Sequence, residues 1–160
     1  MKLTSHDVSY IQECLGDIIN TEEAALMKGF IQHGNITTYS HVLSVACLSY
    51  VINKHVRICS DPRSLIIGAF LHDYYLYDWH VSAKEHKMHG FKHPVTALQN
   101  ARKSYNLNSI EENIIESHMW PLTLTRVPKC SEAVIVCISD KICAVYEFIR
   151  RNKSVYEPKI

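Results

Sequence analysis

The sequence predicts an all-α fold, a helical bundle of roughly six to eight helices. Apolar residues recur at helical spacing along most of the chain, and 47% of its 160 residues are hydrophobic, enough for a sizeable core. No Asn-Gly or Asp-Gly pair stands between two alternating apolar runs, so a β-hairpin signal is missing. We expect a single domain over residues 1–160, with a core at about 36–151 and N-terminal helices within 5–30.

Helix signals are clear in the first part of the chain. Residues 6–16 and 20–30 are amphipathic and predict two helices, and Gly34–Asn35 marks a turn after them. The segment "TTYSHVLSVACLSYVINKH" predicts a long helix, with Thr37 or Thr38 as its N-cap.

Prolines mark the starts of two later helices. Pro62 suits the first turn of a helix that should extend to about residue 72. Residues 74–92 hold many histidines and aromatic residues with little periodicity, which predicts a loop with at most a short helix. His93–Pro94 then starts a helix, with proline at its first position.

The last third of the chain predicts two helices and the loop between them. The pattern "SIEE" at 109–112 is typical of a capping box, and it opens a helix that reaches His118. Residues 119–130 carry two prolines and predict a loop. The final helix should cover about 131–151, and Asp140 and Lys141 break the long apolar stretch within it.

The charge balance argues against a nucleic-acid-binding surface. Lys and Arg number 17 against 16 Asp and Glu, a net charge of +1, and the short run "RRNK" suits a solvated helix end. The N-terminus lacks the continuous apolar core of a signal peptide, and no run reaches transmembrane length. Six cysteines without a C-x-x-C pair suit buried thiols in a reducing compartment. We expect a cytoplasmic protein with neither a membrane nor a nucleic-acid partner, and the sequence leaves its oligomeric state open.

Ionisable side chains interrupt several of the apolar helical segments. They are His41, His72, Asp73, His118 and Asp140, together with His93 at a helix start. Taken singly, His41 suits a structural histidine in a first helical turn, and Asp140 suits a core aspartate paired with Lys141 or an arginine. Taken as a set drawn from several helices, these imidazoles and carboxylates match the ligands that divalent first-row metals use.

The pair His72–Asp73 ends the apolar segment "SLIIGAFL". Burying an unpaired charge is costly, so this pair needs a partner, either a salt bridge or a metal ion. Adjacent residues on a regular helix point about 100° apart, but near a helix C-terminus both can turn toward one ion. The negative end of the helix dipole and the carboxylate of Asp73 both favour a cation there, so a metal ion is the better explanation.

The pattern H…HD…D, formed by His41, His72–Asp73 and Asp140, resembles the HD superfamily of metal-dependent phosphohydrolases, and the resemblance spans most of the chain. It implies an all-α bundle of the HD-domain type. "GFKHPVTAL" is similar to the family's H-P-x-x-small segment and supplies His93, and "IIESHMW" is similar to the segment that supplies a later histidine, His118. This six-ligand pattern occurs in cyclic-dinucleotide phosphodiesterases and in bacterial symmetrical diadenosine tetraphosphate hydrolases.

The resemblance implies a centre with one or two divalent transition-metal ions, drawn from Fe, Mn, Co, Ni or Zn. By analogy, the first ion is held by His41, His72, Asp73 and Asp140, and the second by Asp73, His93 and His118. The implied activity is hydrolysis of a phosphate ester or anhydride, most readily in a small nucleotide, by a metal-bridging hydroxide. Asp73 is then the catalytic residue, because it bridges the two ions.

One position departs from the family's pattern. Many members carry a lysine or arginine three residues after the HD aspartate, and here that residue is Leu76. The candidates for substrate binding in its place are His80, Lys84, His86, His89 and Lys141, and the loop histidines and lysine among them also suit solvated surface positions. The aromatic residues Tyr74, Tyr75, Tyr77 and Trp79 predict either a base-stacking wall or packing for the loop.

Two other functions fit the same ligand set. Some HD-fold proteins with these six ligands use a di-iron centre to activate oxygen and cleave a C–C or C–P bond. A third hypothesis is a non-enzymatic module that keeps the metal as a structural pin or senses a nucleotide, although a pin needs fewer open coordination positions. For the hydrolase, the expected partner is a small-molecule phosphate substrate.

Overall fold

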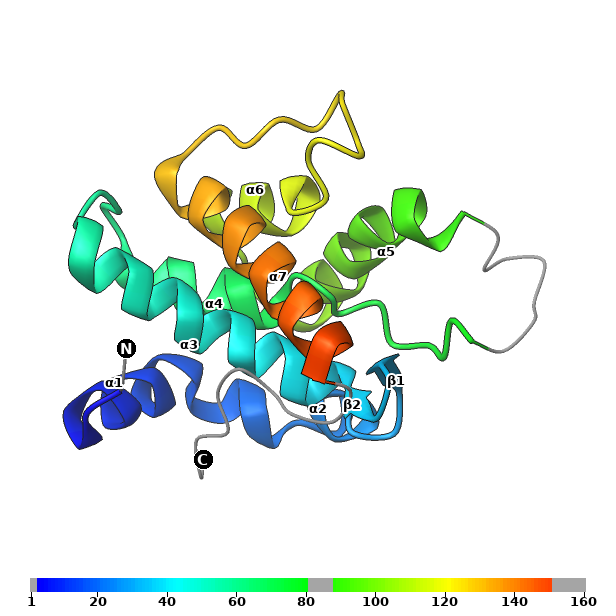
Figure 1. Cartoon of the computed structure of the whole chain (residues 1–160), viewed down its shortest axis with the longest axis horizontal. Coiled ribbons are helices and arrows are strands. Elements are labelled where there is room, and N and C mark those ends of the chain that lie inside the picture. The colour runs from blue at the N-terminus through cyan, green and yellow to red at the C-terminus, as the bar shows by residue number, and fades with distance from the viewer. Residues whose placement is uncertain (1–2, 81–87, 151–160) are drawn as a thin grey trace.

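Two long helices form the framework of the chain. In this computed structural model, which describes residues 3–80 and 88–150, α7 (Ser131–Arg150) crosses in front of α3 (Thr38–Val56) (Figure 1). Helix α3 packs against α4 (Pro62–Leu71), and α6 (Ser109–Ser117) packs against both α4 and α7. The apolar side chains at these contacts form the core.

Helix is the dominant secondary structure, which confirms the predicted all-α class. The other elements, in chain order, are α1 (Ser5–Leu15), the 3₁₀ helix η1 (Gly16–Asn20), α2 (Glu22–Leu26), β1 (Ile31–His33), β2 (Ile36–Thr37) and α5 (His89–Ser104). The seven α-helices of residues 3–80 and 88–150 fall within the expected six to eight. In these residues no helix is both long enough and apolar enough to span a membrane.

The prediction of one helix over 20–30 is wrong. Thr21 caps a new, short helix by accepting a hydrogen bond from the Ala24 N–H (3.1 Å), and α2 ends at Leu26. The helix does not extend to residue 30, because the backbone after α2 bonds to the start of α3 instead. The Phe30 carbonyl accepts a hydrogen bond from the Thr38 N–H (2.8 Å), at the start of α3.

A two-stranded antiparallel hairpin follows α2, which the sequence did not predict. Strands β1 and β2 pair through Ile31–Thr37 and His33–Ile36, with an irregularity between the two pairs. Gly34 lies at the predicted turn with φ of 59°, a conformation that glycine adopts without strain. The strands are too short for an alternating pattern to stand out in the sequence, so the turn was the only signal.

Helices α3 and α4 begin as predicted. The Thr37 side chain accepts a hydrogen bond from the Ser40 N–H and caps α3, and Pro62 occupies the first turn of α4. Gly68 lets α4 and α6 pack closely, because a Cβ there would lie 2.6 Å from Ile114 Cδ1. This close contact brings together the C-terminal ends of α4 and α6, where His72 and His118 lie.

Two predicted helix starts are displaced. Helix α5 begins at His89, and Pro94 lies inside it, because the Phe91 and Lys92 N–H groups already bond to the Met88 carbonyl (2.9 and 3.2 Å). Helix α6 has its capping box one residue earlier than expected. Asn108 is the N-cap, and Glu111 completes the box with its side chain.

Asp7 ties α1 to α3 and should contribute measurably to stability. Its carboxylate accepts hydrogen bonds from Lys54 Nζ (2.8 and 2.9 Å) and from the Tyr50 hydroxyl, and it completes the Thr4 capping box. The Lys54 hydrogen bonds hold the pKa of Asp7 well below its usual range. The ionised carboxylate therefore stabilises the folded state above the ordinary carboxyl pKa of about 4, and this contribution is lost as the pH falls.

We expect Asp7→Asn to lower the free energy of unfolding near neutral pH by about 1–3 kcal/mol. The difference from wild type should shrink in acid, where the wild-type carboxylate takes up a proton. Urea denaturation of both proteins at neutral and acidic pH measures this. The exposed Asp17 of η1 provides the control, and Asp17→Asn should change little at either pH. An equal loss for Asp7→Asn at both pH values would exclude an electrostatic role.

Candidate metal centre

The structure brings the six predicted ligand residues together at one place. Each is buried; three lie within helices, and three lie directly after the ends of α4 and α6. Their positions are the first turn of α3 (His41), the end of α4 (His72 and Asp73), the second turn of α5 (His93), the end of α6 (His118) and the middle of α7 (Asp140).

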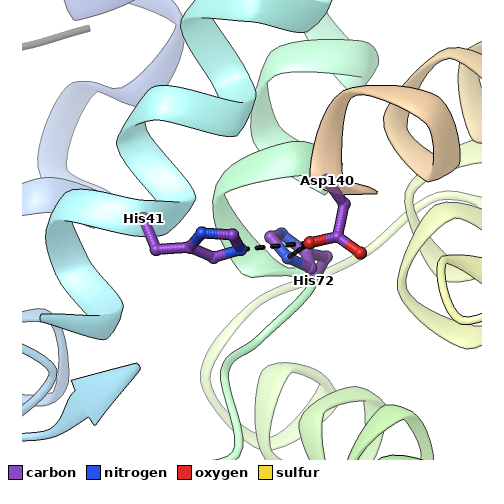
Figure 2. A group of neighbouring side chains, drawn as sticks. All are labelled: His41, His72 and Asp140. Atoms are coloured by element: carbon purple, nitrogen blue, oxygen red, sulfur yellow. Dashed lines mark hydrogen bonds and ion pairs between the residues drawn. The ribbon is translucent and has the colours of Figure 1, made fainter. Parts of the chain in front are cut away.

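One cluster is formed by His41, His72, Asp140 and one carboxylate oxygen of Asp73. Figure 2 shows the side chains of His41 and Asp140 pointing toward each other from α3 and α7, beside His72 of α4. His41 Nε2 lies 3.1 Å from Asp140 Oδ1, and His72 Nε2 lies 3.6 Å from the same oxygen. Asp73 Oδ2 lies 3.4 Å from His72 Nε2 and 4.0 Å from His41 Nε2.

The other carboxylate oxygen of Asp73 faces a second cluster. Asp73 Oδ1 lies 3.1 Å from His93 Nε2 and 3.5 Å from His118 Nε2. The two histidine Nε2 atoms are 2.8 Å apart. Asp73 therefore stands between two sets of donors, with one oxygen directed to each.

The separations within both clusters suit metal coordination. Ligands that bind a first-row metal at about 2.0–2.2 Å lie roughly 3–4 Å from one another, since neighbouring ligands subtend angles near 90–110°. The separations in both clusters fall close to this range. His41, His72 and Asp140 of the first cluster offer ligand atoms within 4.8 Å of one another, and so does a group that joins the two clusters, His72, Asp73 and His118.

Three of the four histidines have Nδ1 bonded to an acceptor, which leaves Nε2 directed into the site. His72 Nδ1 donates to the Ala69 carbonyl (2.7 Å), and His118 Nδ1 donates to the Ile115 carbonyl (2.8 Å). A carbonyl oxygen can only accept, so each Nδ1 carries the proton and each Nε2 lone pair is available when the ring is neutral. Such bonds to the second ring nitrogen are typical of metal-binding histidines.

His41 is held in the same way by a carboxylate that the sequence analysis missed. Its Nδ1 lies 2.9 Å from Glu147 Oε2, and both side chains are fully buried. Glu147 follows Asp140 by seven residues, two turns along α7, so both lie on the same helix face. The sequence could have indicated Glu147, because it is a second acid within an apolar helix and lies on the same helix face as Asp140.

The ionisation of the carboxylates in the clusters also favours a bound cation. Burial alone would lower the pKa of His41, but hydrogen bonds to Asp140 and Glu147 raise it to about 9. Burial likewise opposes protonation of His72, but the charges of Asp73 and Asp140 raise its pKa to about 10. Burial opposes ionisation of Asp73, yet the neighbouring histidines, His72 first, hold the pKa of this carboxyl well below its usual range. The carboxylates thus remain ionised and attract positive charge. A bound metal ion can supply that charge in place of the protons on His41 and His72.

Several buried side-chain polar atoms lack a hydrogen-bond partner among the described residues. Two of them lie in the clusters, His72 Nε2 in the first and Asp73 Oδ1 in the second. Buried polar atoms are almost always paired, so these two indicate a missing ligand. The set of imidazole and carboxylate donors, with these two atoms free to bind, fits a divalent transition metal.

Comparison with protein families identifies the domain. The family model for the HD domain matches residues 38–145, about two thirds of the chain. The chain belongs to the HD domain family. HD domains are generally metal-dependent phosphohydrolases that bind divalent metals, which agrees with the donor clusters. Comparison with curated proteins gave no match. Comparison with solved structures gave none either.

A cavity of about 720 Å³ adjoins the donor clusters of this HD domain. Asp73, His93, His118 and Asp140 line one part of it. Apolar side chains, among them Trp79, Met119, Pro121 and Leu122, line another part. The volume lies within the range of about 300–1,000 Å³ that is typical of small-molecule sites. The cavity can therefore hold a ligand with one polar end at the clusters and a larger apolar part.

Lys141, one of the predicted substrate-binding residues that the structure describes, lines this cavity. Its Nζ donates hydrogen bonds to the carbonyls of His118 (3.0 Å) and Cys137 (3.1 Å). His80 is exposed and contacts Asp78 instead, with Nδ1 at 3.4 Å from Oδ1. Lys84 and His86 lie outside the described residues, as does the side chain of His89, of which only the backbone at the start of α5 is described.

Leu76 and the neighbouring aromatic residues mostly serve packing. Leu76 is partly buried against the core and has φ of 58°. Tyr74 and Tyr75 are buried, and of the four aromatic residues only Trp79 is among the described residues that line the cavity. The expected stacking wall is thus reduced to one candidate side chain.

Gln32 is a further residue that the sequence analysis missed. Its amide donates to Asp73 Oδ2 (2.7 Å), and its carbonyl accepts from the Thr38 hydroxyl (3.2 Å) and from the Tyr75 hydroxyl. This network fixes the orientation of the Asp73 carboxylate. Gln32 belongs to the unpredicted hairpin, so nothing in the sequence marked it.

We expect Glu147→Gln to weaken metal binding by about 10–100-fold with little change in helix content. The neutral amide can still accept from His41 Nδ1, but it no longer supplies the negative charge that makes the imidazole a better ligand. Competition with a chromogenic chelator measures the affinity. Glu116→Gln on α6 is the matched control and should bind metal as wild type does. Unchanged affinity in Glu147→Gln would make Glu147 a packing residue only.

Proposed function

We propose that this HD domain hydrolyses a phosphate ester or anhydride bond in a small nucleotide. His41, His72, Asp73 and Asp140 hold one divalent ion in this proposal, and Asp73, His93 and His118 hold a second. The ions are drawn from Fe, Mn, Co, Ni and Zn, which the imidazole and carboxylate donors suit. Asp73 is the catalytic residue because both ions depend on it.

The observation that carries this proposal is the position of Asp73. Its two oxygens face two separate donor sets, with Oδ2 toward His72 and Oδ1 toward His93. A carboxylate can span the separation of roughly 3.5–4 Å that is usual in two-metal sites. The same carboxylate lines the 720 Å³ cavity, so a substrate there reaches both sets.

The residues around the cavity have separate roles in this reaction. When bound, the metal ions lower the pKa of a coordinated water and neutralise charge on the phosphate. Lys141 lines the cavity, and its ammonium group, held by the His118 and Cys137 carbonyls, adds positive charge to the cavity wall. Trp79 offers an aromatic face to a base, and the apolar lining keeps bulk water away from the reacting phosphate.

The test combines metal analysis with a substrate screen. The full chain is purified without chelator, its metal content is measured, and phosphate release is assayed from nucleoside mono-, di- and triphosphates, cyclic nucleotides, dinucleotides and simple phosphate esters. We expect bound transition metal and turnover of at least one nucleotide class. Asp140→Ala should lose both, because it removes a donor from the first cluster.

Other outcomes separate the rival functions. A mixed-valent iron signal with oxygen uptake, and no phosphate release, would assign the site to an oxygenase. Bound metal with neither activity would indicate a binding module. Metal-free protein that takes up no added metal would exclude all three metal-based functions.

A further inference from the structure

One face of α7 is apolar and open to solvent. Figure 1 shows α7 at the front of the molecule, with no other described element in front of it. The exposed side chains on this face, which we call the α7 stripe, are Val134, Ile138, Ile142, Val145, Phe148 and Ile149. Phe148 is 79% exposed, which is costly for a large aromatic side chain in water.

The loop before α7 extends this apolar surface. Trp120, Leu122, Leu124 and Val127 are each at least 40% exposed. A cavity of about 190 Å³ lies between loop and helix, lined by Trp120, Val127, Pro128, Val134, Cys137 and Ile138. Trp120 and Val127 of the loop therefore meet Val134 and Ile138 of the α7 stripe around one hollow.

The area of this surface suits a protein interface. If a large apolar side chain offers roughly 150–250 Å² when fully open, the ten side chains leave on the order of 1,000 Å² exposed. The largest apolar patch on a typical monomer is about 300–600 Å², and a standard interface buries about 800 Å² per partner. The surface is therefore larger than a monomer usually exposes and large enough for a dimer.

The spacing of the α7 stripe is symmetric about its own centre. Measured from the midpoint between Lys141 and Ile142, Val134 and Ile149 lie equally far on either side, and so do Ile138 and Val145. Two copies of α7 packed antiparallel across a two-fold axis would thus place Val134 opposite Ile149 and Ile138 opposite Val145, with Ile142 beside Lys141 of the other copy at the centre. A two-fold interface requires this self-complementarity.

The same pairing brings the most exposed side chain to the hollow. Phe148 of one copy would lie opposite residue 135 of the other, between Val134 and Ile138, and both of these line the 190 Å³ cavity. An aromatic anchor that fills a pocket is the usual centre of a strong interface. We propose that the chain forms a two-fold homodimer through antiparallel packing of the α7 stripes, with Phe148 of each copy seated in the cavity of the other.

A membrane surface fits the α7 stripe less well. Helices that lie on membranes are rich in lysine and arginine beside their apolar face. Between Val134 and Ile149 the only basic residue is Lys141, and it is bonded to the His118 and Cys137 carbonyls. The proposal does not depend on the metal centre, so its outcome is independent of the proposed function.

The test is the oligomeric state of the full chain in solution. Sedimentation velocity and light scattering should give the mass of a dimer for wild type. Phe148→Ala should weaken the dimer at least about tenfold, because it empties the cavity. Leu26→Ala is the matched control, since Leu26 is 54% exposed on α2, outside both the α7 stripe and the loop before it, and it should leave the dimer intact.

A charge pair tests the antiparallel register. Ile138→Glu alone should give a monomer, and the double variant Ile138→Glu/Val145→Lys should restore the dimer, because each glutamate then faces a lysine of the other copy. Circular dichroism of each variant establishes that it is folded. A monomeric wild type would overturn the proposal, as would a dimer unaffected by Ile138→Glu. Binding of wild-type monomer to phosphatidylcholine–phosphatidylglycerol vesicles would assign the α7 stripe to a membrane instead.

Discussion

Asp73→Ala should abolish metal binding and lower kcat/KM by at least about a thousandfold, a loss of about 4 kcal/mol of transition-state stabilisation. Both donor clusters include this carboxylate, so its removal takes a ligand from each ion. Metal content after purification without chelator and phosphate release from the best substrate measure the two effects. The second depends on the proposed hydrolase activity, and the first does not.

The fold should survive Asp73→Ala. An unpaired buried charge would be costly, but the nearby imidazoles can lose a proton and become neutral when the acid is gone. The pKa of His72, which the charge of Asp73 raises, should then fall as burial dominates. We therefore expect a stability within about 1–2 kcal/mol of metal-free wild type.

The matched control for this substitution is Asp78→Ala. Asp78 lies five residues further along the chain, is partly exposed and contacts His80 rather than either cluster. It should retain metal and activity. If Asp73→Ala bound metal as wild type does, or if it unfolded while wild type proved metal-free, Asp73 would be a structural partner of the histidines.

The site was largely predictable because its residues stand out locally. A buried acid such as Asp140, within an almost wholly apolar helix, needs a partner, and the sequence shows that need without showing the partner. His72 and Asp73 end an apolar helix in the same way. The sequence therefore indicated which buried ionisable residues need partners, and the convergence of α3, α4, α5, α6 and α7 brings them together.

The supporting residues were not predictable in the same way. Gln32 reaches Asp73 from a hairpin whose strands are two and three residues long, too short to give a periodic signal. Its role follows from a contact across 41 positions of the chain, which no local pattern encodes. Glu147 is the contrasting case. The sequence shows that it shares a helix face with Asp140, but it does not show that its partner is His41.

The start of α5 shows why proline is an ambiguous marker. Pro94 suits the first turn of a helix, and the sequence analysis placed it there. In the structure the helix begins a turn earlier, at His89, and His93 precedes the proline inside the helix. His93 is therefore on a regular, buried part of α5 rather than at a flexible boundary, which orients its ring toward Asp73 and His118.

His93→Ala and His118→Ala should each remove one metal ion per chain and leave the other bound. Their Nε2 atoms contact Asp73 Oδ1 and each other, which places them in the second cluster. The remaining donors, His41, His72, Asp73 and Asp140, are sufficient to bind one ion. With a single ion, one of the two positive charges that stabilise the reacting phosphate is missing. Activity should therefore fall by about a hundredfold or more.

The comparison with His41→Ala makes the assignment specific. That variant removes a donor from the first cluster, so the ion held by His93 and His118 should persist where the other is weakened. His55→Ala is the control, because His55 is exposed and bonds only locally, to the Val51 carbonyl, and it should keep both ions and full activity. Metal stoichiometry is measured beside phosphate release for all four variants. The site would be mononuclear if both His93→Ala and His118→Ala kept wild-type metal content and full activity. The second cluster would then be two histidines hydrogen-bonded to each other and to Asp73.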